Sequence, residues 1–469
     1  MGYAETTNLT DIDDTSMALR LLRLQGYPMS SDVLEIFKDR DRNPSTWPGG
    51  SSRAISDTLN LYRYCQVAFP GEKILKEFKG FAREHLQNCL RHNEVLDSWS
   101  MKKSLEKEVS RALQVPWTMS LERLEAREYI KNYGDNDIWI AKTLYRMYNV
   151  NDSRYLELAK LDYNRLLSLY QEELTSVQEW WIISGFEDSS ISKAKPTETH
   201  FGISATLYEP EFETSRVAYT KCNCLENLIS YLFDQHHSMN DLALFCQAVK
   251  KWDTNPSVIN SLPPILKAVS MATYHTLNQM AVQISKVQGI DIFPYLHDLR
   301  VKQIEHYMKS RELRGNPHSF NDHVEQRKGD LGVAIRLLPP LFLMGEKVKE
   351  SSIKWLNEKS VIQQHLTTFL ALFIDIQKHK RRKEKETKAP TAINLWANEK
   401  SCTEKEALSY LEAKMDEQLD GLVHEVFKQS YLLPRICRRI MLEHARIIQH
   451  FNKSEIKLRD DVECMFSPF

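Results

Sequence analysis

Three carboxylates near the start of the chain have the clearest chemical potential. They stand in the sequence Asp11-Ile12-Asp13-Asp14. Like charges this close repel one another, and such repulsion raises the pKa of one carboxyl. A carboxylic acid that keeps its proton at neutral pH can act as a general acid. The alternative is structural, because an aspartate at a helix N-terminus caps the backbone and suits the helix dipole. The spacing alone leaves both interpretations open.

The residues after this motif predict the element that must position it. Met17, Leu21 and Leu24 recur at helical spacing, and residues 26–28 (Gly-Tyr-Pro) form a stop signal. Apolar residues three and four positions apart are typical of an amphipathic helix with one buried face. We therefore expect the carboxylates to lie at the N-terminal end of a helix.

The rest of the chain also predicts helices. Gly accounts for 15 and Pro for 17 of the 469 residues, which is low, and both are unfavourable inside helices. No segment alternates apolar and polar residues as a half-buried strand does. The fold class expected is therefore all-α. The helical periodicity covers residues 54–68, 71–92, 120–132, 136–147, 153–184, most of 201–375 and 403–463.

Composition excludes several classes of protein. The formal net charge is −1, with 62 basic and 63 acidic residues, which argues against a general nucleic-acid binder. No apolar run reaches the roughly 18 residues of a membrane span. The eight cysteines are dispersed, which predicts free or buried thiols in a reducing compartment.

Four segments, in order along the chain, resemble plant class II diterpene cyclases, the copalyl diphosphate synthase family of the terpene synthase superfamily. They are DIDDTSMALRLLRLQGY (11–27), NLYRYCQVAFPGEKIL (60–75), RLEAREYIKNYGDNDIWIAKTLYRM (123–147) and YLELAKLDYNRLLSLYQEEL (155–174). The resemblance implies a partial α-barrel, or β domain, over residues 1–152 that carries the acid motif. It implies a terpene-synthase α-helical bundle, or α domain, over residues 153–469.

The resemblance also implies a reaction. Geranylgeranyl diphosphate binds with its diphosphate retained, and Asp13 protonates the terminal double bond. Asp11 and Asp14 orient Asp13 and tune its acidity, and the product is a copalyl (labdane-type) diphosphate. Lys103, with its neighbour Lys102, matches a family lysine near the diphosphate. A plain surface lysine pair is the alternative for these two residues.

A second, class I chemistry of the superfamily ionises the diphosphate with metal ions held by two carboxylate-rich sets. The first set falls on residues 230–234, where only Asp234 remains. Lys378 and Arg382 occupy ligand positions of the second set, and cations there repel Mg²⁺. We therefore expect no class I activity and assign no metal ligands. Asp234 and Asp375 are interpreted as surface or capping residues.

Several expectations follow from the family alone. Mg²⁺ is its cofactor, its full-length members lie in the plastid, and a downstream class I diterpene synthase can take up the product. In the family the acid motif lies deep in the chain, whereas here it begins at residue 11 without a transit peptide before it. The sequence is therefore expected to lack an N-terminal part. An inactive or non-catalytic helical fragment of such an enzyme is the alternative function.

Overall fold

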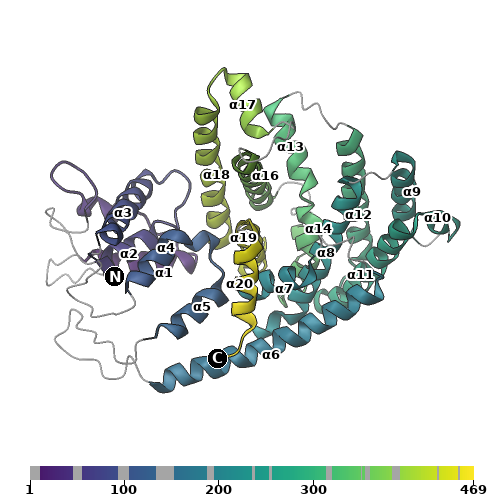
Figure 1. Ribbon diagram of the computed structural model, residues 1–469, viewed down its shortest axis with the longest axis horizontal. Coiled ribbons are helices and arrows are strands. Elements are labelled where there is room, and N and C mark those ends of the chain that lie inside the picture. Colours follow the sequence, from purple (N-terminus) through teal and green to yellow (C-terminus); the bar gives the residue numbers. More distant parts are fainter. Residues whose placement is uncertain are drawn as a thin grey trace. The chain divides into compact units, whose positions relative to one another are not determined.

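A computed structural model gives the architecture of the chain (Figure 1). The structure describes residues 11–45, 55–92, 94, 105–133, 153–186, 195–234, 238–252, 256–312, 319–349, 351–353, 360–382, 391–429, 432–452 and 455–469. Within these ranges the regular elements are helices, and one isolated antiparallel bridge joins Lys38 and Pro44. The all-α prediction is confirmed.

The chain forms two compact units. The first unit comprises residues 1–165, 420–429 and 468–469, and the second comprises residues 166–419 and 430–467. The assignment of the class II and class I roles to residues 1–152 and 153–469 stays a prediction.

The first unit is a small helical bundle. Its elements are α1 (Ile12–Leu24), the 3₁₀ helix η1 (Asp32–Phe37), α2 (Ile55–Tyr64), α3 (Lys73–Arg91), α4 (Leu105–Gln114), the 3₁₀ helix η2 (Trp117–Met119), α5 (Glu122–Lys131) and the start of α6 (Ser153–Ile183). Leu19, Phe37, Leu75 and Phe78 belong to one buried apolar cluster that holds α1, η1 and α3 together. The predicted apolar face of α1 is therefore the face that packs.

Distant parts of the chain complete this unit. Asn164 exchanges two hydrogen bonds with the backbone of Phe469, at 2.9 and 3.4 Å. The Phe469 ring packs edge-on against Tyr163, with the ring centroids 5.1 Å apart. The His424 ring lies 4.8 Å from Phe69. Residues more than 300 positions away along the chain thus contribute to the same bundle.

The second unit is a larger helical bundle. Its elements are α6 from residue 166 on, α7 (Pro196–Thr206), the 3₁₀ helix η4 (Pro210–Phe212), α8 (Glu213–Asp234), α9 (Met239–Lys250), α10 (Pro256–Asn260), α11 (Pro264–Gln288), α12 (Phe293–Glu312), α13 (Phe320–Asp330), α14 (Val333–Phe342), α16 (Val361–Arg382), α17 (Ala392–Lys400), α18 (Glu404–Phe427) up to residue 419, α19 (Arg435–Phe451) and α20 (Glu455–Phe466). Helix α8 packs against α7 and α14.

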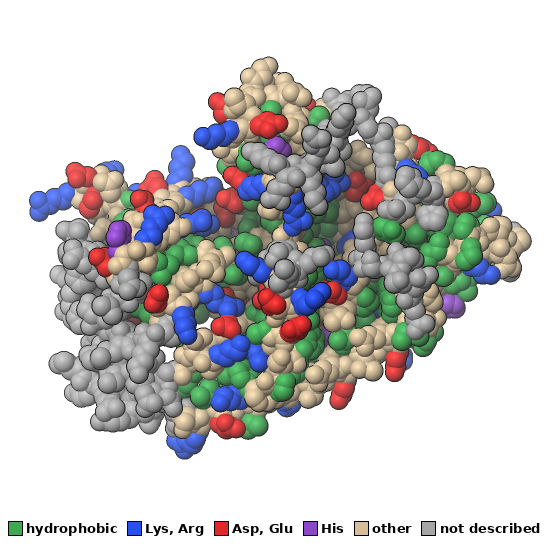
Figure 2. Space-filling model, in the orientation of Figure 1, with side chains coloured by type: hydrophobic (Ala, Val, Ile, Leu, Met, Phe, Trp, Pro, Cys, Tyr) green, Lys and Arg blue, Asp and Glu red, His purple; other side chains and the backbone are tan. Residues whose placement is uncertain are grey.

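The mixed surface charge and the free cysteines match what the amino-acid composition predicts. On the face shown in Figure 2, Lys and Arg side chains lie interspersed with Asp and Glu side chains. All eight cysteines are free, as predicted, and Cys222 and Cys224 are buried. Burial raises the pKa of both thiols to about 12. Among the described helices, none combines the length and the apolar character that a membrane crossing requires.

Candidate functional site

The acid motif lies at the N-terminus of α1. The Asp11 carboxylate accepts hydrogen bonds from the backbone N–H groups of Asp13 (2.8 Å) and Asp14 (3.4 Å). Asp11 is therefore the N-cap of the helix, which satisfies backbone donors that no helical turn can satisfy. The structural alternative raised by the sequence is confirmed for this residue.

Asp13 and Asp14 differ in their surroundings. Asp13 is half-buried, and its Oδ1 accepts a hydrogen bond from the side-chain amide of Asn60 on α2. Asp14 is exposed. The structure therefore distinguishes one carboxylate of the motif as a group held by a neighbouring helix. Whether the three carboxylates act in catalysis stays a prediction.

A buried ion pair anchors the other end of α1. The Arg23 side chain is fully buried and forms a salt bridge with Glu72. Its guanidinium also donates to the carbonyl oxygens of Met29 (2.7 Å) and Val67 (2.9 Å). Glu72 accepts further hydrogen bonds from the Ser31 hydroxyl and the Phe69 N–H. The Arg23 and Glu72 side chains therefore tie the end of α1 to the segment between α2 and α3 and to the N-terminus of α3.

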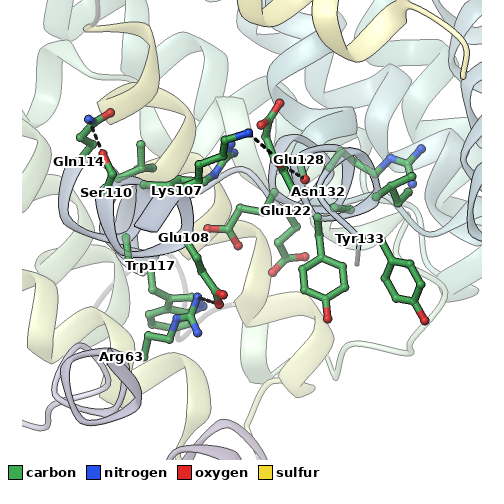
Figure 3. A pocket seen from close by; sticks show the side chains of 18 of the residues that line it. Arg63, Lys107, Glu108, Ser110, Gln114, Trp117, Glu122, Glu128, Asn132 and Tyr133 are labelled. Carbon is green, nitrogen blue, oxygen red and sulfur yellow. Dashed lines mark hydrogen bonds and ion pairs between the residues drawn. The ribbon is translucent and has the colours of Figure 1, made fainter. Parts of the chain in front are cut away.

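A cavity of about 1410 Å³ lies in the same unit (Figure 3). It is lined mainly by α4 and α5, with Arg20 from α1 and Arg63 from α2. Arg20 is seven residues after Asp13, so it lies on the same face of α1, about 10 Å further along the helix axis. Arg20 is the residue of α1 that lines the cavity, whereas Asp11, Asp13 and Asp14 are not among the lining residues.

Charged and aromatic side chains share the cavity wall. Arg63 forms a salt bridge of 2.7 Å with Glu108, and the Lys107 ammonium donates to the Asn132 amide oxygen at 3.2 Å. Trp117 and Tyr133 add aromatic surface (Figure 3). The wall also carries six carboxylates, so the charge of its basic side chains is balanced and the lining does not by itself select an anionic ligand; they are Glu106, Glu108, Glu122, Glu125, Glu128 and Asp162.

Two predicted diphosphate ligands cannot be placed. Lys102 and Lys103 lie outside the described residues, so their role stays a prediction. The nearest described residue in the sequence is Leu105, the first residue of α4.

The residues at the predicted class I positions do not assemble a metal site. Asp234 is exposed at the end of α8, and Lys378 is exposed on α16. Asp375 is 1% exposed, so of the two interpretations, surface or capping residue, the surface one is wrong and the capping one fits. It accepts hydrogen bonds from His323 (2.6 Å) and from the Ala392 N–H (3.0 Å), so it joins α16 to α13 and to the start of α17.

The electrostatics of Asp375 explain why it tolerates burial. Burial alone would raise the pKa of this carboxyl, but the hydrogen bond from His323 and the positive charge of Arg327 together lower the pKa below its usual value. The role of Asp375 is therefore structural. Among the described residues, no group of three or more His, Cys, Asp or Glu side chains could hold a metal ion.

Comparison with known proteins places these observations in a family. Residues 184–420 match the description "Terpene synthase family, metal binding domain", and residues 2–113 match "Terpene synthase, N-terminal domain". The chain is 37% identical over 455 residues to a bifunctional levopimaradiene synthase, chloroplastic, of Ginkgo biloba. The aligned region covers 96% of this chain and 52% of that protein. The chain thus spans about half the length of this relative.

Solved structures of diterpene synthases superpose on this chain. Abietadiene synthase from Abies grandis superposes with a TM-score of 0.91 at 33% identity, covering 100% of this chain and 63% of that one. The ent-copalyl diphosphate synthase from Arabidopsis thaliana, in complex with (S)-15-aza-14,15-dihydrogeranylgeranyl thiolodiphosphate, gives 0.75 at 25% identity, covering 98% and 58%.

A third structure shares the fold. Isoprene synthase from grey poplar (Populus x canescens), in complex with three Mg²⁺ ions and dimethylallyl-S-thiolodiphosphate, superposes with a TM-score of 0.82 at 23% identity, covering 98% of this chain and 85% of that one. Its likeness is one of fold. The two matched domains, the all-helical architecture and the likeness to diterpene synthases lead to one conclusion: the chain belongs to the terpene synthase family.

Proposed function

We propose that this chain carries class II diterpene cyclase chemistry, in which geranylgeranyl diphosphate is protonated and cyclised to a copalyl (labdane-type) diphosphate. The observation that carries the proposal is the half-buried Asp13 carboxylate, held by Asn60 at the N-terminus of α1. The likeness to a copalyl diphosphate synthase that holds a geranylgeranyl analogue supports the choice of substrate.

The proposed step is a proton transfer followed by carbon–carbon bond formation. Because Oδ1 of Asp13 accepts the hydrogen bond from Asn60, the proton to be donated is carried by Oδ2. It moves to the terminal double bond of the substrate, and the resulting cation is attacked by the next double bonds to close two rings. A base then removes a proton, so the product is an isomer of the substrate and the diphosphate is retained.

The neighbouring residues have supporting roles. Asp11 fixes the first turn of α1 and so sets the position of Asp13. Asp14, the next residue along α1, is proposed to orient Asp13 and to tune its acidity. The proposed carbocation requires a pocket that excludes water and offers aromatic faces.

The polar end of the substrate needs cations. Lys103 and Lys102 are proposed to approach the diphosphate. Mg²⁺ is proposed as a cofactor of the reaction, and no set of described residues is assigned to hold it. The plastid is the proposed location, and a separate class I diterpene synthase is proposed to consume the product.

A product assay tests the proposal. The purified chain is incubated with geranylgeranyl diphosphate and Mg²⁺, and the products are dephosphorylated and separated by gas chromatography. The same assay is run on a form extended upstream through the genomic reading frame, and the bicyclic alcohol is expected from this extended form. In it we expect a loss of about 10²-fold or more in Asp13→Asn and no loss in Asp460→Asn, which alters an exposed aspartate. If neither form yields a bicyclic product although both fold, the non-catalytic alternative is favoured.

A further inference from the structure

The interior of the second unit contains a charged network where α8, α12 and α14 meet. Glu226 on α8 and Arg300 on α12 form a salt bridge, and both side chains are at most 1% exposed. The Tyr307 hydroxyl donates to Glu226 Oε1 at 2.6 Å and is also buried. Burial and the charge of Glu226 raise the pKa of Tyr307 well above its ordinary value, so the hydroxyl stays a donor.

The network continues along α14. The Arg336 guanidinium donates to the amide oxygens of Asn227 (2.8 Å) and Asn223 (3.1 Å), both on α8, and its Nε donates to the Leu331 carbonyl at 2.8 Å. Gly332 packs directly on Glu226, because a Cβ atom there would lie 2.6 Å from Glu226 Oε1. The Gly332 backbone, Arg300 and Tyr307 therefore surround the Glu226 carboxylate, and Arg336 binds the neighbouring asparagines of α8.

The same arrangement recurs at the other buried carboxylates of this unit. Glu173 pairs with Arg216, Glu443 pairs with Arg446, and Asp375 lies between His323 and Arg327. Within the described part of the second unit, each buried carboxylate thus has a protein cation beside it. Mg²⁺ demands about six oxygen ligands in octahedral geometry, and a carboxylate that already faces an arginine is a poor ligand because the metal must displace that cation.

We infer that the buried carboxylates described in the second unit are permanent ion-pair partners and do not serve as ligands of a catalytic Mg²⁺ cluster. In the part of the unit that the structure describes, the residues do not fit the metal that the matched domain is described as binding. The second unit then serves as structural support. This inference does not depend on the proposed class II activity.

Metal binding gives the first test. Mn²⁺ replaces Mg²⁺ and is followed by electron paramagnetic resonance in the presence of inorganic pyrophosphate. We expect the amount of bound Mn²⁺ to be the same in the wild-type protein and in Asp234→Asn. A variant with the carboxylate sets restored (Ser230→Asp, Tyr231→Asp, Ile374→Asn, Lys378→Ser and Arg382→Glu) serves as the positive control. Wild-type Mn²⁺ binding that disappears in Asp234→Asn would overturn the inference.

Stability gives the second test, with thermal unfolding of the full chain as the readout. Glu226→Gln and Arg300→Met each leave a buried partner unpaired, so each should lower the unfolding temperature by about 10 °C. The double variant Glu226→Leu with Arg300→Met replaces the pair by apolar groups and should recover most of that loss. If the single variants leave the unfolding temperature unchanged, the pair is not a structural core and the inference fails.

Discussion

The side chain of Asn60 reaches across 47 residues of sequence to donate a hydrogen bond to Asp13, and so ties α2 to the acid motif. The bond fixes the direction in which the Asp13 carboxyl points. Together with the Asp11 cap, it leaves this carboxyl little rotational freedom. A proton donor held in one orientation loses less activity to unproductive geometries.

Replacing Asn60 tests this positioning role. Asn60→Ala removes the donor, so the turnover number for the bicyclic product should fall by about tenfold while the KM changes little. Asn60→Asp should reduce it further, because it places a second negative charge beside Asp13 and opposes charge development there. Steady-state kinetics on folded variants provide the measurement. A KM increase with an unchanged turnover number would instead assign Asn60 to substrate binding.

Arg23 is predicted to be among the most sensitive positions for stability. Arg23→Ala should lower the free energy of unfolding by about 3–5 kcal/mol, because Glu72 would remain as an unpaired, mostly buried charge. Arg23→Lys should recover little, since one ammonium cannot reach Met29, Val67 and Glu72 together. Urea unfolding measures both values. Arg165→Ala, which alters an exposed salt bridge, should change stability by less than about 1 kcal/mol.

Gly332 provides a prediction about the backbone. Gly332→Ala should destabilise the protein by about 3 kcal/mol, because φ is +57° and the new methyl group meets the Glu226 carboxylate. Gly289→Ala is the matched control, since φ is +76° there but no atom lies within 4 Å. It should cost only about 1 kcal/mol. Equal losses of stability in the two variants would show that a glycine is needed at position 332 only for its positive φ.

A buried histidine predicts a pH dependence of stability. Burial and the charge of Arg336 lower the pKa of His444 to about 3, and the Tyr219 hydroxyl lies 2.7 Å from its Nδ1. Between pH 6.5 and 3 the unfolded chain binds a proton at this residue and the folded chain does not. Stability is therefore fully present above pH 6.5 and decreases as the pH falls, by on the order of 2 kcal/mol at pH 5.

Denaturant unfolding at several pH values checks this contribution. His444→Gln should reduce the slope of the unfolding free energy against pH between pH 6.5 and 5, by an amount that corresponds to about one bound proton. His275→Gln, which alters an exposed histidine, should leave it as in the wild type. A His444→Gln protein with the wild-type slope would show that another group titrates in this range.

The helices were largely predictable from the sequence, because apolar periodicity dictates which face is buried. The segment predicted over 71–92 is α3 (Lys73–Arg91), and the one predicted over 153–184 is α6 (Ser153–Ile183). Residues 32–37 form the 3₁₀ helix η1 (Asp32–Phe37), which lies outside the segments predicted to be helical. Segments this short are commonly 3₁₀, where single contacts such as the burial of Phe37 outweigh α-helical propensity.

The site was less predictable, because its contacts are not local. The motif identified Asp13, but nothing in the spacing pointed to Asn60 as its partner. Glu226 and Arg300 carry charges that sequence patterns place on solvated faces, and only the packing of α8 on α12 shows that they neutralise each other in the interior. For the same reason Asp375 was interpreted as a surface or capping residue without any sign of its burial, which depends on His323 and Arg327.

The docking of Phe469 on Asn164 and Tyr163 has a consequence for biosynthesis. A ribosome releases residue 165 long before it has translated residues 420–429 and 468–469, which belong to the same unit. At about 5–20 residues per second, the first bundle waits tens of seconds for its last contacts. The first bundle therefore stays incomplete until the second bundle has been translated. A peptide tag fused after Phe469 would hinder the docking of Phe469 on Asn164 and Tyr163.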